Sequence, residues 1–245
     1  MFTADLTRNQ DGRPRERVAV VAFPGSNDDH DALWALAALG ADPVLVWHGE
    51  TELPRRVSAI VLPGGFSYGD YLRCGAIARF APVMAAVRAF AAGGGLVLGI
   101  CNGFQILCEA GLLPGALLAN ASLSFVCRDV CVRVKRADTP FTTRCDAGQE
   151  LTVPIKHGEG RWFGGPELVA ELERSGQIVL RYAAGDNPNG SVDDVAGLIS
   201  AEGNVMGLMP HPEHAVDPLL GSGDGALLLA SMLDAARDRS LAAFT

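Results

Sequence analysis

Short apolar runs rich in β-branched residues alternate with helix-like segments over the first 115 residues, and this alternation limits the possible folds more than any other feature. Runs that are apolar on both faces are typical of central strands in a parallel sheet. Helices between such strands cover the two faces of the sheet, which is the doubly wound α/β arrangement. The predicted strands are residues 17–23, 43–47, 58–65 and 96–99, and the predicted helices are residues 28–39, 75–92 and 102–110.

The pattern changes after residue 115, where apolar runs follow one another with few helical segments between them. Such runs are expected to form antiparallel edge strands or a small additional sheet. The fold class is therefore predicted as α/β: a flavodoxin-like, doubly wound, mainly parallel sheet with helices on both faces and extra antiparallel edge strands. The later strands are predicted at residues 130–135, 151–155, 177–183, 195–200 and 204–209, before a last helix at residues 223–237.

Nothing in the sequence divides this pattern into separate units. No Pro/Ser-rich linker, internal repeat or low-complexity block occurs, and a chain of 245 residues is long enough to bury a large core. Residues 17–245 are therefore predicted to form a single domain. Residues 1–16 are polar, lack the apolar stretch of a signal peptide, and are predicted to be a flexible N-terminal arm.

Charge and hydropathy exclude two classes of function. The net charge is −8, which argues against a protein that mainly binds nucleic acid or anionic lipid. Residues 89–108 carry no formal charge, but the glycines at 93–95 would break a spanning helix. Asn102 and Gln105 would also lie in hydrocarbon, so no membrane span is expected.

The cysteines indicate the chemical setting. None of the six belongs to a CxxC pair, which favours free thiols in a reducing, cytoplasmic compartment. Cys127 and Cys131 are four residues apart with no histidine near them in the sequence. They are interpreted as core thiols, and no metal site is expected.

A cysteine lies between a predicted strand and a predicted helix in the sequence GICNGFQ, residues 99–105. This is the pattern of a nucleophile elbow with cysteine in place of serine. Gly99 and Gly103 remove the Cβ atoms that would clash in a sharp turn, and the partly positive N-terminus of the helix favours the thiolate of Cys101. The backbone N–H of Asn102 is then free to stabilise an oxyanion. The alternative is a buried cysteine on a glycine-flanked turn that serves packing only.

A cysteine nucleophile needs a base, and the base needs a group that orients it. Among the five histidines His211 is preferred, because Pro210 and Pro212 hold its segment extended directly after a predicted strand. Glu213 can lie on the same side as His211 and accept its imidazole N–H. The alternative is a surface turn with a solvated histidine and glutamate, but together with Cys101 a Cys–His–Glu triad is the better interpretation.

A second oxyanion donor would have to come from a loop beside the elbow. The segment Pro63-Gly64-Gly65 ends a predicted strand, and paired glycines let a backbone N–H, here that of Gly65, approach a substrate closely. Pro-Gly-Gly is also an ordinary turn, so this motif carries little weight by itself.

Motifs spread over about residues 17–235 resemble those of a known family. The triad segments resemble the class I, triad-type glutamine amidotransferases. Three further segments are similar to the PurQ-type glutaminase subunits of phosphoribosylformylglycinamidine (FGAM) synthase, and the longest of these is the most specific. The triad segments are LPGG (62–65), GICNGFQ (99–105) and PHPE (210–213), and the further segments are FPGSN (23–27), GGFSYGDYLRCG (64–75) and PIKHGEGR (154–161).

The resemblance implies a role for each motif. Cys101 would attack the side-chain amide of L-glutamine, His211 would transfer protons, and Glu213 would orient His211. The amides of Gly65 and Asn102 would hold the oxyanion. Contacts to the substrate glutamine are expected from Gln105, Ser124, Phe125, His157 and Glu159.

The resemblance also implies partners. Ammonia released with a γ-glutamyl thioester would pass to a large PurL-type synthetase subunit, which uses ATP to convert formylglycinamide ribonucleotide to formylglycinamidine ribonucleotide in de novo purine biosynthesis. A small PurS-type subunit would complete the assembly. The chain contains no G-x-x-x-x-G-K-[ST] phosphate loop. No cofactor is therefore expected in it, and ATP and Mg²⁺ are expected on the synthetase.

Three other functions share part of this pattern. Another Cys-dependent amidase or a γ-glutamyl hydrolase on the same fold would share the elbow, but the segments 64–75 and 157–161 argue against it. A non-catalytic interaction module would have no need of Cys101, His211 and Glu213. A dinucleotide site would need G-x-G-x-x-G after a strand, and the glycines around the fourth predicted strand do not provide that order.

Overall fold

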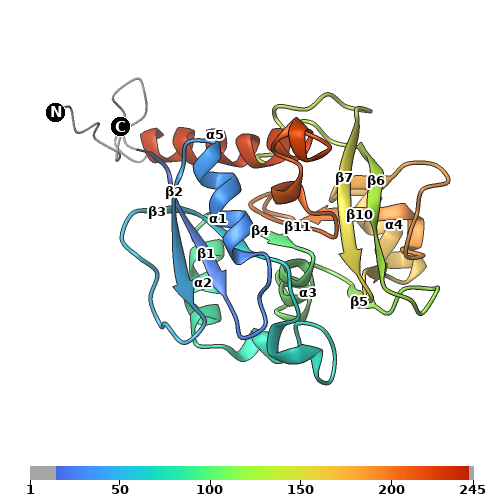
Figure 1. The fold of residues 1–245 in the computed structure, drawn as a ribbon, viewed down its shortest axis with the longest axis horizontal. Helices are drawn as coiled ribbons and strands as arrows, with labels where there is room; N and C mark the ends of the chain where they lie inside the picture. Colours follow the sequence, from blue (N-terminus) through green and yellow to red (C-terminus); the bar gives the residue numbers. More distant parts are fainter. Residues whose placement is uncertain (1–14, 243–245) are drawn as a thin grey trace.

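The computed structural model describes residues 15–242, which form an α/β fold built on one large sheet (Figure 1). The predicted N-terminal arm, residues 1–16, lies almost wholly outside the described residues. The strands are β1 (Arg17–Ala22), β2 (Asp42–Trp47), β3 (Val57–Leu62), β4 (Leu96–Ile100), β5 (Ala116–Leu118), β6 (Val126–Val134), β7 (Glu150–His157), β8 (Arg161–Phe163), β9 (Ile178–Tyr182), β10 (Val195–Ile199) and β11 (Val205–Leu208). The α-helices are α1 (Asp29–Ala38), α2 (Val83–Ala92), α3 (Asn102–Glu109), α4 (Pro166–Arg174) and α5 (Gly225–Ala242).

The large sheet has the strand order β2-β1-β3-β4-β11-β10-β9-β6-β7. The strands from β2 to β11 pair in parallel, and the remaining pairs are antiparallel. The parallel part has the flavodoxin order, with β11 as its fifth strand. In Figure 1, α1 and α5 lie on one side of these strands and α2 and α3 on the other. The predicted fold class is therefore confirmed.

The position of β11 differs from the prediction. Residues 204–209 were expected in an antiparallel edge or a small additional sheet, but β11 lies inside the large sheet, parallel to β4 and antiparallel to β10. All of its residues are buried, as expected for a strand covered on both faces. This placement brings the loop that follows β11 beside the loop that follows β4.

Two helical predictions also change. The helix predicted over residues 75–92 is broken: a short 3₁₀ turn ends before Ala81, whose backbone is extended, and α2 begins after Pro82. A residue before proline avoids the helical conformation, which explains the break. Helix α4 was not predicted, although Leu168, Val169 and Leu172 lie at helical spacing and pack on the core, because it is short and only Leu172 is fully buried. Its proline at the first position was the available signal.

The apolar stretch at residues 89–108 folds as the end of α2, strand β4 and helix α3. Among the residues that the structure describes, no helix has both the length and the apolar character needed to cross a membrane.

Parallel strands place their carboxyl ends along one edge of the sheet, where open α/β sheets bind ligands. The loops after β1, β3, β4 and β11 meet at this edge. They carry Asp28, Gly65, Cys101 and His211, respectively.

Candidate active site

Cys101 occupies the sharp turn between β4 and α3. Its backbone has φ 50° and ψ −104°, a strained conformation for a residue with a side chain. The turn is possible because the backbone packs closely on both sides of it: a Cβ at Gly103 would overlap the carbonyl oxygen of Leu62 on β3, and one at Gly99 would overlap Gly103. The predicted elbow is therefore present, with the buried thiol of Cys101 at the N-terminus of α3.

Replacing Gly103 by alanine should destabilise the elbow. The added methyl group has to displace the backbone of β3, so we expect the free energy of unfolding to fall by about 2–3 kcal/mol, measured by urea unfolding. Gly165→Ala is the matched control, because no heavy atom lies within 4 Å of the added Cβ and φ there is −64°. Equal unfolding midpoints for the two variants would contradict the tight packing at Gly103.

His211 follows β11 and is held by two hydrogen bonds. Its backbone N–H donates to the carbonyl oxygen of Pro154 on β7 at 2.9 Å. Its Nδ1 lies 2.6 Å from Oε1 of Glu213, and both side chains are fully buried. Burial lowers the pKa of His211, but the charges of Glu213 and Cys101 outweigh it and raise the pKa to about 10. The imidazole is therefore charged at neutral pH, and Nε2 is the nitrogen left for proton exchange with the sulfur of Cys101.

The two predicted oxyanion donors lie beside Cys101. Asn102 begins α3, and the first amides of a helix have no intrahelical acceptor. Its side chain accepts from the N–H of Ser67 at 3.3 Å and donates to Gln105 at 2.8 Å, which ties the elbow to the loop after β3. Gly65 lies on that loop with φ +144°. A Cβ there would lie 2.7 Å from the amide nitrogen of Asn27, so the loop is packed against the segment after β1.

A cavity of about 150 Å³ opens in front of Cys101. Most of the predicted substrate contacts line it. The side chain of Ser124 does not; it is exposed and its hydroxyl donates to the carbonyl of Ser122 at 3.2 Å. The lining residues are Gly65, Phe66, Asp70, Cys74, Cys101, Gln105, Phe125, Lys156, His157, Gly158 and Glu159.

The polar wall of the cavity is held by hydrogen bonds between its own residues. Gln105 donates through Nε2 to the carbonyl of Glu159 at 2.5 Å. His157 is buried, with Nδ1 3.1 Å from Oδ1 of Asn120. Burial and the charge of His211 lower the pKa of His157 to about 4, so this ring is neutral at pH 7.

Cys74 is not among the predicted site residues, but the structure places it in the cavity wall. Its Sγ donates to Oε2 of Glu159 at 2.9 Å. Burial, the hydrogen bond to Glu159 and the charge of Asp70 raise the pKa of this thiol well above its usual range. Cys74 therefore stays protonated, in contrast to a nucleophile. The sequence feature that could have indicated this position is that Cys74 belongs to the family-specific segment 64–75.

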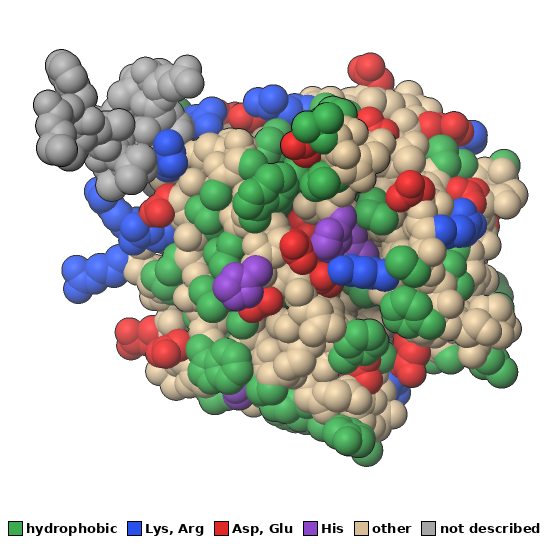
Figure 2. All heavy atoms as spheres, in the orientation of Figure 1, with side chains coloured by type: hydrophobic (Ala, Val, Ile, Leu, Met, Phe, Trp, Pro, Cys, Tyr) green, Lys and Arg blue, Asp and Glu red, His purple; other side chains and the backbone are tan. Residues whose placement is uncertain are grey.

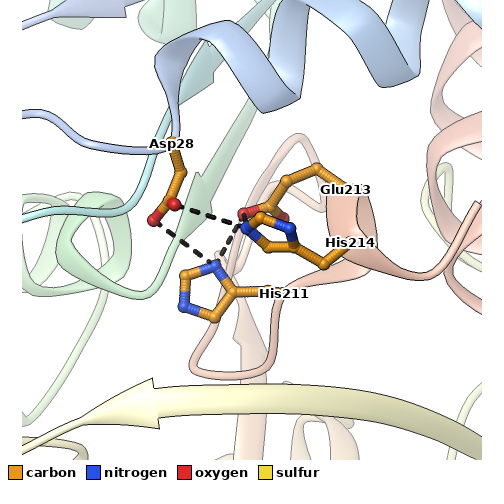
Figure 3. Close-up of side chains that lie close together, drawn as sticks. All are labelled: Asp28, His211, Glu213 and His214. Carbon is orange, nitrogen blue, oxygen red and sulfur yellow. Dashed lines mark hydrogen bonds and ion pairs between the residues drawn. The ribbon is translucent and has the colours of Figure 1, made fainter. Parts of the chain in front are cut away.

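Three side chains outside the predicted set also contact this region: Lys156, and Asp28 and His214, which Figure 3 shows beside His211. Ligand atoms of Asp28, His211, Glu213 and His214 lie within 4.8 Å of one another, close enough to hold a metal ion. The ammonium group of Lys156 already donates to Asp28 and lies 2.9 Å from Nε2 of His214. This group supplies the positive charge that the carboxylates need, so the donor set does not favour a metal.

The site opens on a mixed surface. Figure 2 shows acidic, histidine and basic side chains gathered near the middle of one face, with hydrophobic side chains around them. Several loops present large apolar side chains to solvent. They include Phe66, Tyr71 and Leu72 after β3, Leu123 and Phe125 before β6, and Leu219 and Leu220 before α5.

Comparisons with known proteins show the family of the chain. The model of the CobB/CobQ-like glutamine amidotransferase domain matches residues 15–223. The PurQ subunit of phosphoribosylformylglycinamidine synthase from Rubrobacter xylanophilus is 60% identical over 221 residues, which cover 90% of this chain and 99% of that protein. The PurQ subunit from Frankia casuarinae is 54% identical over 218 residues, covering 89% and 93%.

Solved structures give the same result. A chain in the structure of PurLQS from Thermotoga maritima superposes with a TM-score of 0.82 at 43% identity, covering 90% of this chain and 98% of that one. A putative GMP synthase subunit from Thermoplasma acidophilum has a TM-score of 0.66 at 15% identity, covering 94% and 98%. The second likeness shows the fold alone.

Proposed function

The chain belongs to the CobB/CobQ-like glutamine amidotransferase family, and within it to the PurQ subunits of FGAM synthase. We propose that it releases ammonia from L-glutamine for that synthase through Cys101, His211 and Glu213. The observation that carries this proposal is the strained elbow, which holds a thiol at a helix N-terminus beside a buried histidine–carboxylate pair.

The first half of the reaction forms a thioester. The proton of Cys101 passes to Nε2 of His211, and the thiolate attacks the side-chain amide carbon of glutamine. The oxyanion that develops accepts hydrogen bonds from the amides of Gly65 and Asn102. The imidazolium of His211 gives its proton to the nitrogen of the leaving group, and the C–N bond breaks. Ammonia departs, and a γ-glutamyl thioester remains on Cys101.

The second half of the reaction restores the enzyme. His211 takes a proton from water as the resulting hydroxide attacks the thioester carbon, and the C–S bond then breaks with its electron pair on sulfur. Glutamate leaves and loses its carboxyl proton to solvent, and the sulfur of Cys101 again shares the proton of His211. Glu213 accepts the Nδ1–H of His211 throughout, which leaves Nε2 for the proton exchange with Cys101. Gln105, Phe125, His157 and Glu159 line the space in which the glutamine would lie.

The ammonia is proposed to pass to a PurL-type synthetase, which binds ATP and Mg²⁺, in an assembly that includes a PurS-type subunit. The similarity to a chain of PurLQS supports this partnership. Two exposed apolar side chains at the cavity, Phe66 and Phe125, fit a surface that a partner covers. We place the enzyme in the cytoplasm, which agrees with its free cysteines.

Partner subunits should stimulate glutamine hydrolysis. A glutaminase that ran alone would waste ammonia, so we expect glutamate release to rise about ten-fold or more when the synthetase and small subunits are added. The assay measures glutamate with and without the partners, and partners mixed with a Cys101→Ala chain give the background. Equal rates with and without partners would instead indicate an independent amidase.

A further inference from the structure

One charged group packs against His211 but has no part in the reaction described above. Asp28 comes from the loop between β1 and α1, and its side chain is only 3% exposed. Its Oδ2 lies 3.7 Å from Nδ1 of His211, the nitrogen that also bonds Glu213 (Figure 3). The imidazole therefore faces two buried carboxylates.

The other oxygen of Asp28 is held by two basic side chains. The ammonium of Lys156, on β7, donates to Oδ1, and Nε2 of His214 lies 3.3 Å from the same oxygen. Lys156 and His214 are themselves 2.9 Å apart. Burial opposes ionisation of Asp28, but His214, His211 and Lys156 outweigh it and lower the pKa of this carboxyl. Asp28 is thus a fixed negative charge at neutral pH.

The backbone around Asp28 leaves its side chain little freedom. The N–H groups of Asn27 and Asp28 lie 3.1 and 3.3 Å from the carbonyl oxygen of Gly64, so the loops after β1 and β3 are joined. A Cβ at Gly64 would overlap the carboxylate of Asp28 and lie 2.7 Å from Cε1 of His211. Gly64 therefore packs directly against both groups, and neither can shift toward the loop after β3.

We propose that Asp28 is a positioning residue for His211: its carboxylate, braced by Lys156 and His214, fixes the imidazole beside Glu213 and helps keep the ring protonated opposite the Cys101 thiolate. This inference rests on the proposed function, because it concerns the proton transfer by His211. Asp28 does not line the cavity, so it has no direct contact with the glutamine.

The charges around His211 determine whether each substitution should raise or lower the pKa of its imidazole. Removing the Asp28 carboxylate also leaves the Lys156 ammonium uncompensated, and both changes disfavour the imidazolium. Removing the Lys156 charge leaves Asp28 uncompensated, which favours the imidazolium. The titratable groups facing the ring are Glu213 and His214 from the turn after β11, Asp28 from the loop after β1, Lys156 and His157 from β7, and Cys101 from the elbow.

The experiment is an NMR titration of the full chain labelled with ¹⁵N-histidine, in which a His211→Asn variant assigns the His211 signals. We expect the midpoint of His211 to fall by about 1 pH unit in Asp28→Asn and to rise by a similar amount in Lys156→Met. The double variant should titrate close to the wild type. In parallel, Asp28→Asn should lower kcat for glutamine roughly ten-fold and change KM less than about two-fold.

Asp31→Asn is the matched control. It removes the same charge from a half-exposed carboxylate 3.8 Å from His214, on the helix that follows Asp28, and should leave the titration of His211 unchanged. Shifts of the same sign in Asp28→Asn and Lys156→Met, or no shift in either, would overturn the inference. If Asp28→Asn does not fold, the inference is tested by whether the titration midpoint of His211 rises in Lys156→Met. The titration needs no turnover, so a wild-type chain that releases no glutamate with its partners would count against the proposed function alone.

Discussion

Serine at position 101 should reduce glutamine-dependent FGAM synthesis by the assembled synthase by roughly 10⁴-fold or more, the size of loss seen when a covalent nucleophile is removed. A hydroxyl keeps the shape of the side chain but does not give up its proton to His211 as a thiol does. The elbow should still form, because its geometry depends on Gly99 and Gly103 rather than on sulfur. The measurement is FGAM formation with glutamine as the nitrogen donor.

The same Cys101→Ser assembly should keep its activity when ammonium chloride replaces glutamine, since the synthetase site lies on another chain. Cys108→Ser is the matched control: it makes the same change at a buried thiol in α3 that does not line the cavity. Its glutamine-dependent rate should stay within about three-fold of the wild type, because core changes of this size cost little activity. Loss of the ammonia-dependent rate in Cys101→Ser would contradict the proposed separation of the two reactions.

The parallel half of the fold was predictable because each of its strands is apolar on both faces and is followed by a helix or a glycine turn. The position of residues 204–209 in the sheet could not be predicted in this way. Their apolar pattern predicts a buried strand, but strand order depends on tertiary pairing, and β11 pairs with β4 across about 100 residues of sequence. A pattern of period two or 3.6 carries no information on such a partner.

The site residues likewise include some that local sequence predicts and some that only the tertiary fold brings together. Cys101 could be predicted from glycines within two residues of it, and Glu213 from its spacing to His211. Asp28 and Lys156 could not, because they are 128 residues apart and meet only in the folded chain. In the local sequence, Asp28 is simply an acidic residue before a helix, and Lys156 is a polar residue in a strand of alternating pattern. Their roles depend on the sheet edge that brings the loops after β1 and β11 against β7.

Glu213→Gln should lower kcat for glutamine by roughly 10³- to 10⁴-fold with little change in folding, as expected when the orienting carboxylate of a triad becomes an amide. The side chain is buried and its Oε1 lies 2.6 Å from Nδ1 of His211. An amide of the same shape can turn its NH₂ group toward Nδ1, which leaves the hydrogen of the neutral ring on Nε2, where it cannot accept the proton of Cys101. The carboxylate also raises the pKa of His211, so the variant ring should lose its charge at lower pH.

Two measurements separate this effect from a simple loss of structure. Alkylation of Cys101 by iodoacetamide at neutral pH should slow together with kcat, because fewer imidazolium–thiolate pairs form, while the melting temperature stays close to that of the wild type. Glu202→Gln makes the same change on the exposed turn before β11 and should alter neither rate. A Glu213→Gln chain that keeps more than about a tenth of the wild-type kcat would mean that Asp28 alone can orient His211, because two carboxylates face the same ring and the loss of one then costs less than the loss of a sole partner.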